Sequence, residues 1–224
     1  MKKLPVVKAF DSIAGEWNAK HSKPRPWVVL FKKFLKKSDV ILDAGCGNGI
    51  NAIALAPFVE KTYAVDASPR MVSFAKSNVL NYGLQKKILV SKASILALPF
   101  ADSSFDSVAY FAVIHHFAKP NEWKKIFSEM RRVLKPKGLA FVTVWNKLKG
   151  LETEPKVVFL GFPKKNGERV PRMHYFFEEG QLTCLAEESG FIVEEVFYER
   201  NGEKTTKGKG RNLCLVLSKP KSPY

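Results

Sequence analysis

The sequence predicts an α/β fold in which helices cover both faces of a mostly parallel sheet. Short apolar segments alternate with longer amphipathic segments along most of the 224 residues, as strands alternate with helices. Strand–helix–strand units of this kind join parallel strands through right-handed crossovers. With 46% hydrophobic residues the chain can fill a core, and we expect residues 1–224 to form one domain.

A strand is expected at each short buried segment, and a helix at each amphipathic segment between them. The first two strands end at Asp43 and Asp66. Ser68-Pro69 then begins a helix, because serine suits the N-cap and proline suits the first helical position. The predicted strands are 40–42, 62–65, 88–90, 105–113, 139–145, 191–198 and 213–217, and the predicted helices are 50–58, 69–82, 121–134 and 178–188.

Two regions lie outside this alternation. Residues 1–37 are predicted to form a helical extension, with amphipathic helices at 6–17 and 26–37. The link between them is expected to be extended, because its two prolines disfavour helix. Residues 146–177 are predicted to form an excursion on the substrate side of the sheet, since most of this segment has no clear periodicity.

The positive charge is concentrated in a few segments. The net charge is +16, and segments 1–37, 147–172 and 200–211 carry +8, +4 and +4. A polyanionic partner such as RNA would explain this layout. The alternative is a lysine-rich solvated surface of the kind seen in many thermophile proteins.

Cysteine usage and hydropathy indicate a reducing, cytoplasmic setting. Cys46, Cys184 and Cys214 are far apart and form no CxxC pair, so neither a disulfide framework nor a zinc site is expected. No apolar run approaches the roughly 20 residues of a membrane span. The first residues lack the apolar stretch of a signal peptide, and no membrane association is expected.

A glycine-rich loop, residues 43–49, joins the first strand to the first helix of the sheet. It lacks the lysine of a phosphate-binding loop, and Ile50 stands where a dinucleotide fingerprint needs glycine. Asp66 ends the second strand, where a carboxylate can accept hydrogen bonds from both hydroxyls of a ribose. The alternative is that Asp66 only caps the helix that begins at Ser68.

This Asp-x-Gly-x-Gly-x-Gly loop with its strand-end acid resembles the cofactor site of S-adenosylmethionine (SAM)-dependent methyltransferases. The resemblance implies SAM as cofactor and a Rossmann-like, seven-stranded, mostly parallel sheet with an antiparallel last strand. It implies that Asp43 helps hold the methionine ammonium group. Segment 93–100 resembles G-D-A-x-x-L-P-F, with Ser94 replacing the acid that meets adenine. The expected cofactor-binding residues are Asp43, Gly45, Cys46, Gly47, Asp66, Ala67, Ser94, Ile95 and Ala112.

The loop after the fourth strand carries His115 and His116, where such enzymes place acceptor chemistry. The loop has no [DN]PP[YF] motif for exocyclic amines and no cysteine nucleophile for pyrimidine C5. No metal site is expected, because adjacent residues of an extended chain point to opposite faces and no third ligand is evident. We expect His115 to orient the loop and His116 to face the substrate.

Several segments resemble the tRNA wobble-uridine carboxymethyl methyltransferase family, which forms the methyl ester of 5-carboxymethyluridine. The matching segments are 10–14, 23–27, 112–117, 144–145 and 172–182. In the last of these, the family histidine falls on Tyr175, with His174 one place earlier. The resemblance implies tRNA as substrate and a small zinc-binding activator protein that covers an apolar edge of the sheet. The residues expected to position the acceptor are His116, Arg25, Arg172 and Tyr175.

A carboxylate acceptor is already anionic at neutral pH, so its methylation needs no general base. The enzyme has only to hold acceptor and methyl group in line at about 3–3.5 Å. Trp27 or Trp145 is a candidate to stack on a flipped base, although core packing also suits Trp145. Two other functions stay open: methylation of a small molecule such as a quinone, lipid or metabolite, and non-catalytic RNA binding on the same fold.

Overall fold

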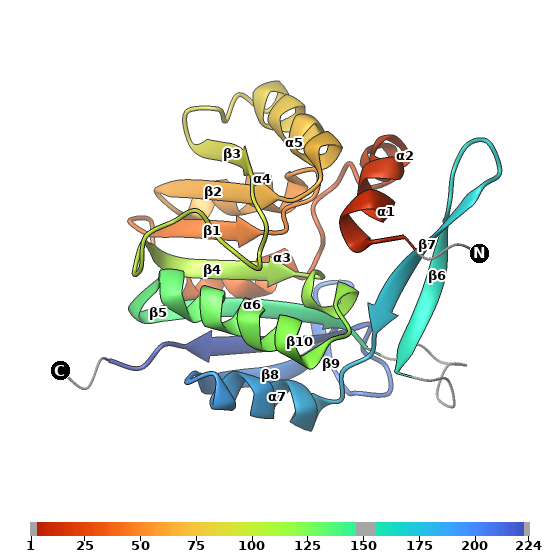
Figure 1. Ribbon diagram of the computed structural model, residues 1–224. Helices are drawn as coiled ribbons and strands as arrows, with labels where there is room; N and C mark the ends of the chain where they lie inside the picture. The colour runs from red at the N-terminus through yellow and green to blue at the C-terminus, as the bar shows by residue number, and fades with distance from the viewer. Residues whose placement is uncertain (1–3, 147–155, 222–224) are drawn as a thin grey trace.

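A computed structural model describes residues 4–146 and 156–221. Within these residues, eight strands form one sheet in the order β3-β2-β1-β4-β5-β10-β8-β9 (Figure 1). The strands are β1 (Val40–Ala44), β2 (Lys61–Asp66), β3 (Ile88–Lys92), β4 (Phe105–Phe111), β5 (Leu134–Trp145), β8 (Ile192–Arg200), β9 (Glu203–Thr205) and β10 (Asn212–Ser218).

The sheet topology confirms the predicted fold class. Strands β1 to β5 are parallel neighbours, and β10 is antiparallel to both β5 and β8. The antiparallel strand beside the fifth is therefore where the resemblance placed it. The short β9 pairs with β8 inside the segment 200–211, and extends the predicted seven strands by one.

Helices cover both faces of this sheet because alternate strand residues point to opposite faces. Leu42, Val108 and Tyr110 pack in one cluster with α6 (Pro120–Val133) and α7 (Glu179–Glu188). The strand residues that alternate with these point to the other face of the sheet. There they pack against α3 (Val28–Phe31), α4 (Ile50–Leu55) and α5 (Pro69–Asn81). No helix in the described part of the chain is long and apolar enough to cross a bilayer.

The N-terminal helices are shorter than predicted. The helix expected at 6–17 is divided at buried Ile13 into α1 (Val6–Ser12) and α2 (Ala14–Lys20), since the Ile13 N–H bonds back to Phe10 in a tighter turn. The helix expected at 26–37 is limited to α3 and a following 3₁₀ turn, η1 (Lys32–Phe34).

The substrate-side excursion contains regular structure that the sequence analysis did not predict. Strands β6 (Val157–Pro163) and β7 (Arg169–Tyr175) form an antiparallel hairpin, and residues 147–155 lie outside the described residues. Figure 1 shows α1 and α2 beside this hairpin, at the end of the sheet toward which β1, β2 and β4 point. Buried Ile13 packs there with Phe162 and Val170, so the extension and the hairpin share one small core.

Candidate cofactor and acceptor site

A cavity of about 590 Å³ lies at the carboxyl ends of the parallel strands, and residues of α1, α2 and the hairpin also line it. Open α/β sheets bind ligands at this edge. The predicted site residues that line the cavity are Gly45, Cys46, Gly47, Asp66, Ala67, Ser94, Ile95, Ala112, Arg25, His116 and Arg172. Two predicted residues, Asp43 and Tyr175, do not line it.

The glycine loop is preformed by hydrogen bonds to the next strand. The Gly45 and Cys46 N–H groups donate to the Val65 carbonyl at 2.8 and 2.9 Å, and the Gly47 N–H donates to Asp66 Oδ2 at 2.9 Å. Gly45 has a φ of +79°, and a Cβ there would lie 2.5 Å from a methyl carbon of Val113. Only glycine therefore fits where the loop passes the β4 end.

Asp66 also contacts the helix that follows it. Its Oδ1 accepts from the Ser68 N–H at 2.9 Å, while the Ser68 hydroxyl accepts from the Met71 N–H as the N-cap. Asp66 thus braces both the glycine loop and the start of α5, and its carboxylate still lines the cavity. Each carboxylate oxygen has a further lone pair for a ribose hydroxyl.

Asp43 lies below the glycine loop with only 1% of its surface exposed. Burial raises the pKa of this carboxyl to about 7, with a further contribution from the charge of Asp66. Among the described residues, its Oδ2 has no hydrogen-bond partner. A buried, unpaired carboxylate favours a cationic group nearby, which suits the ammonium and sulfonium charges of SAM.

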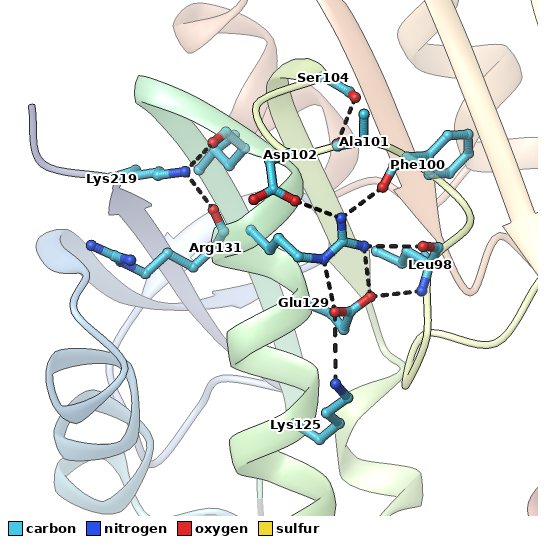
Figure 2. A network of polar contacts seen from close by, with 11 residues as sticks. Leu98, Phe100, Ala101, Asp102, Ser104, Lys125, Glu129, Arg131 and Lys219 are labelled. Carbon is cyan, nitrogen blue, oxygen red and sulfur yellow. Dashed lines mark hydrogen bonds and ion pairs between the residues drawn. The ribbon is translucent and has the colours of Figure 1, made fainter. Parts of the chain in front are cut away.

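The remaining cofactor segments come from the ends of β3 and β4. Ser94 and Ile95 line the cavity, and the Ser94 hydroxyl accepts from the Leu96 N–H at 3.2 Å. Ala112 has a φ of +57°, a strained conformation for a residue with a Cβ, and its N–H donates to Thr143. Past Leu96, an ion network fixes the chain to α6 (Figure 2).

The acceptor end of the cavity is strongly basic. The cations that line the cavity are Lys23, Arg25, Lys119, Arg172 and Arg211, and its lining acids are Asp66 and Glu122. Arg172 is only 7% exposed, and its guanidinium lies 5.7, 5.3 and 5.2 Å from the ring centres of Phe10, Trp17 and Phe162. Desolvation lowers the pKa of Arg172 to about 10, and its Nε–H has no acceptor in the described structure.

Three histidines meet beside Arg172, which corrects the expectation that His115 and His116 point apart without a third partner. They lie in a 3₁₀ turn, η3 (Ile114–His116), and His174 of β7 brings its ring nitrogen within 4.8 Å of theirs. His116 Nδ1 lies 2.8 Å from the Met173 carbonyl, so it carries the proton. The Trp145 N–H donates to His115 Nδ1 at 3.3 Å, so the His115 proton is on Nε2.

These tautomers do not suit a divalent cation bound by all three rings. A metal needs a lone pair on each ligand nitrogen, but His115 Nε2 is protonated and lacks an acceptor among the described atoms. Desolvation is the main cause that lowers the pKa of His115, His116 and His174, and the nearby Arg172 charge lowers it further. We therefore assign no ion here, and the absence of a metal stays a prediction.

Tyr175 does not occupy the acceptor end. Its ring packs against Trp123 and Phe177, with ring centres 4.6 and 4.7 Å away, and its hydroxyl hydrogen-bonds to Gln181. The preceding residue, His174, instead stacks between Trp145 and His115. The acceptor role expected of Tyr175 is therefore wrong in this structure, because its side chain belongs to the core beside α6 and α7.

Sequence reasoning also missed Arg211. Its guanidinium lies 5.8 Å from the Trp145 ring centre, much as Arg25 lies 5.6 Å from that of Trp27. The signal was its place one residue before the strand that was predicted to insert beside the fifth.

Comparison with known proteins finds methyltransferases. The family described as "Methyltransferase domain" matches residues 42–142. A tRNA (carboxymethyluridine(34)-5-O)-methyltransferase of Arabidopsis thaliana is 31% identical over 148 residues, or 65% of this chain. The aligned part spans 33% of that relative's length.

Solved structures share the whole fold at low identity. An S-adenosylmethionine-dependent methyltransferase from Clostridium acetobutylicum has a TM-score of 0.74 at 14% identity, covering 94% of this chain and 99% of its own. A putative methyltransferase of Haloferax volcanii, solved with the Trm112 methyltransferase activator, has a TM-score of 0.74 at 18% identity, covering 98% and 99%. Residues 42–142 thus match a methyltransferase domain family, and the whole chain shares its fold with solved SAM-dependent methyltransferases.

Proposed function

We propose that this chain methylates the carboxylate of 5-carboxymethyluridine at the wobble position of tRNA, giving the methyl ester. The observation that carries this proposal is Arg172, a buried guanidinium with no acid paired to it among the described residues, at the acceptor end of the cavity. A buried charge is costly unless it is paired. An anionic acceptor supplies the missing partner.

The proposed methyl transfer requires little more than that the acceptor and the cofactor are held in the right geometry. SAM supplies a methyl group on a positively charged sulfur. In the transfer, a carboxylate oxygen forms a bond to the methyl carbon as the carbon–sulfur bond breaks, and no proton is released. Arg172 would hold the carboxylate, with His115 Nε2–H as a second donor and His116 and Arg25 as positioning residues. Asp43, Asp66 and the glycine loop would hold the cofactor.

The placement of the basic segments supports an RNA substrate. The link 23–27, strand β7 and the segment 200–211 all contribute cations to one cavity. Gly202 lies against Pro26, close enough that a Cβ would come within 3.0 Å of it, so the first and last basic segments are adjacent. The similarity to the plant tRNA methyltransferase points the same way. A small acidic metabolite would need no such extended basic rim.

We also propose an activator partner at the free edge of the sheet. Strand β3 is one of the two edge strands of the described sheet, and Leu80, Tyr82 and Leu89 near it are large apolar side chains with 62%, 56% and 41% exposure. Exposed apolar patches mark protein interfaces. The H. volcanii structural relative was solved with an activator, which motivates a small zinc-binding protein as the occupant.

The test is methyl transfer from radiolabelled SAM to tRNA that carries 5-carboxymethyluridine, with nucleosides analysed by mass spectrometry. We expect an alkali-labile methyl ester, because esters hydrolyse in base whereas N- and C-methyl groups do not. Arg172→Met should lower kcat/KM at least about tenfold, given about 1.5–3 kcal/mol for a charged hydrogen bond. Alkali-stable label on unmodified tRNA, or methylation of a small molecule without salt-sensitive tRNA binding, would refute the proposal.

A further inference from the structure

Three arginines line the acceptor end at different depths. Arg172 is buried, Arg25 is half-buried and Arg211 is exposed, and all three border the same cavity. The lining therefore carries positive charge from its floor to its mouth. The proposed carboxylate pairs with Arg172, and it supplies no anionic partner for either Arg25 or Arg211.

The two outer arginines are held in place by rigid parts of the fold. The Arg25 N–H donates to Asn51 Oδ1 at 3.2 Å, and its guanidinium lies over Trp27, which is buried in the core. The Arg211 N–H donates to the Glu199 carbonyl at 2.7 Å, and its guanidinium lies over Trp145. Each guanidinium group thus lies over an aromatic ring, an arrangement that guanidinium groups adopt at recognition sites.

Neither guanidinium has a carboxylate partner in the described part of the chain. Burial and the nearby charge of Arg211 together lower the pKa of Arg25, so the two cations repel one another. Two like charges fixed side by side destabilise the free protein, and a shared anion between them removes that cost.

We propose that Arg25 and Arg211 bind a phosphodiester group next to the methylated nucleotide, separately from the carboxylate at Arg172. This inference rests on the proposed function. Arg211 lies at the mouth, so its anion belongs to a ligand that continues into solvent, as an RNA backbone does. A carboxymethylated nucleotide within an RNA chain supplies one anion for the floor and another for the mouth, whereas a free nucleoside lacks the second anion.

The test compares substrates with and without phosphate. We would measure kcat/KM for an anticodon stem-loop RNA that carries 5-carboxymethyluridine, and for the free 5-carboxymethyluridine nucleoside. In Arg211→Met, and equally in Arg25→Met, the ratio of the two values should fall about tenfold or more through KM for the RNA.

Arg200→Met is the matched control, because it removes the same charge from the same segment. The Arg200 side chain bonds to the Lys209 carbonyl and does not line the cavity. Its ratio should change less than about twofold. The phosphate site is refuted if Arg211→Met and Arg200→Met behave alike, or if Arg211→Met weakens SAM binding tenfold, which would assign the arginine to the cofactor carboxylate.

A binding measurement separates this proposal from the proposed function. Calorimetry with uridine 3′,5′-bisphosphate and with uridine, both in the presence of S-adenosylhomocysteine, needs no turnover. Bisphosphate binding that is lost in Arg211→Met but kept in Arg200→Met supports the site, even if no tRNA is methylated. Equal affinity of the wild-type chain for bisphosphate and uridine overturns it, even if tRNA is methylated.

Discussion

At the residue scale, we expect Asp43 to couple cofactor binding to pH. Its pKa is raised to about 7 by burial and by Asp66, whereas a bound ammonium group stabilises the ionised form. SAM should therefore bind with release of a proton, and its affinity should fall below pH 7. We expect the dissociation constant to rise about tenfold from pH 8 to pH 6, measured by calorimetry.

Asp43→Asn provides the control for this pH dependence. The amide keeps the shape of the side chain and removes the titration, so the variant should bind SAM weakly with a nearly flat pH profile between 6 and 8. A profile as steep as that of the wild-type chain would assign the proton to another group, of which Asp66 is the nearest candidate because burial also raises its pKa.

Gly45, Gly47 and Asp66, which are proposed to hold the cofactor, could be placed together from the sequence because they lie in one short loop and at one strand end. The positions of Gly45, Gly47 and Asp66 relative to one another are set by the loop and the adjacent strand end, and they do not depend on the rest of the chain. His174 was not predictable, and Arg211 was predictable only from its place before β10, since they reach the site through the docking of β7 and the insertion of β10. Tyr175 shows how a shift of one residue along a strand moves a side chain to the other face.

At the scale of elements, an ion network on α6 holds residues 98–102, which follow Ser94 and Ile95 in the chain (Figure 2). Glu129 is 5% exposed and accepts from the Leu98 N–H at 2.7 Å, while Arg132 donates to the Leu98 and Phe100 carbonyls and to Asp102. The Arg132 charge helps keep the pKa of Glu129 below its usual value. These bonds hold α6 and residues 98–102 together.

Arg132→Met should destabilise the chain by about 1–3 kcal/mol, measured by urea unfolding, because it leaves the Glu129 carboxylate buried without its main partner. The estimate is reduced because the Arg132 side chain is 29% exposed. Lys125→Met is the control: this exposed lysine pairs with the same carboxylate at 3.8 Å and should cost less than about 0.5 kcal/mol. Equal costs for both would show that the network adds nothing beyond a surface ion pair.

Strands were easier to predict than the substrate-side elements. Buried apolar runs identify β1, β2 and β4 whatever lies around them. The hairpin of β6 and β7 was missed although β6 carries the apolar run 157–160, and this run is only partly buried and packs on α1 and α2 instead of the main core. Its structure depends on tertiary contacts that no local pattern reports.

At the scale of the whole molecule, buried histidines link stability to pH. Desolvation lowers the pKa of His21 and His116 to about 4 and of His174 to about 2, and also lowers that of His115. In the unfolded chain each titrates near 6.5, so protons bind the unfolded state first and stability falls as pH drops from about 6.5 toward 4. Each histidine contributes up to about 1.4 kcal/mol per pH unit.

The buried acids act in the opposite direction. Their raised folded-state pKa lets Asp43 and Asp66 bind protons in the native state first, which stabilises it as pH falls below about 7. Four histidines outweigh two acids, so the free energy of unfolding should be at least about 2 kcal/mol lower at pH 5 than at pH 7. His174→Phe keeps the stacking on Trp145 and should flatten this slope; an unchanged slope would exclude His174 as a contributor.

The position of strand β10 has a consequence for the order in which the sheet is assembled. It follows every other strand in the chain, yet it lies in the sheet interior, between β5 and β8. Until it is inserted, two interior strands each have an open edge, and Arg211 is not yet beside Arg25. The residues proposed to hold the cofactor lie within 43–112, whereas the mouth that would admit RNA is completed by the segment 200–211, which follows them in the chain.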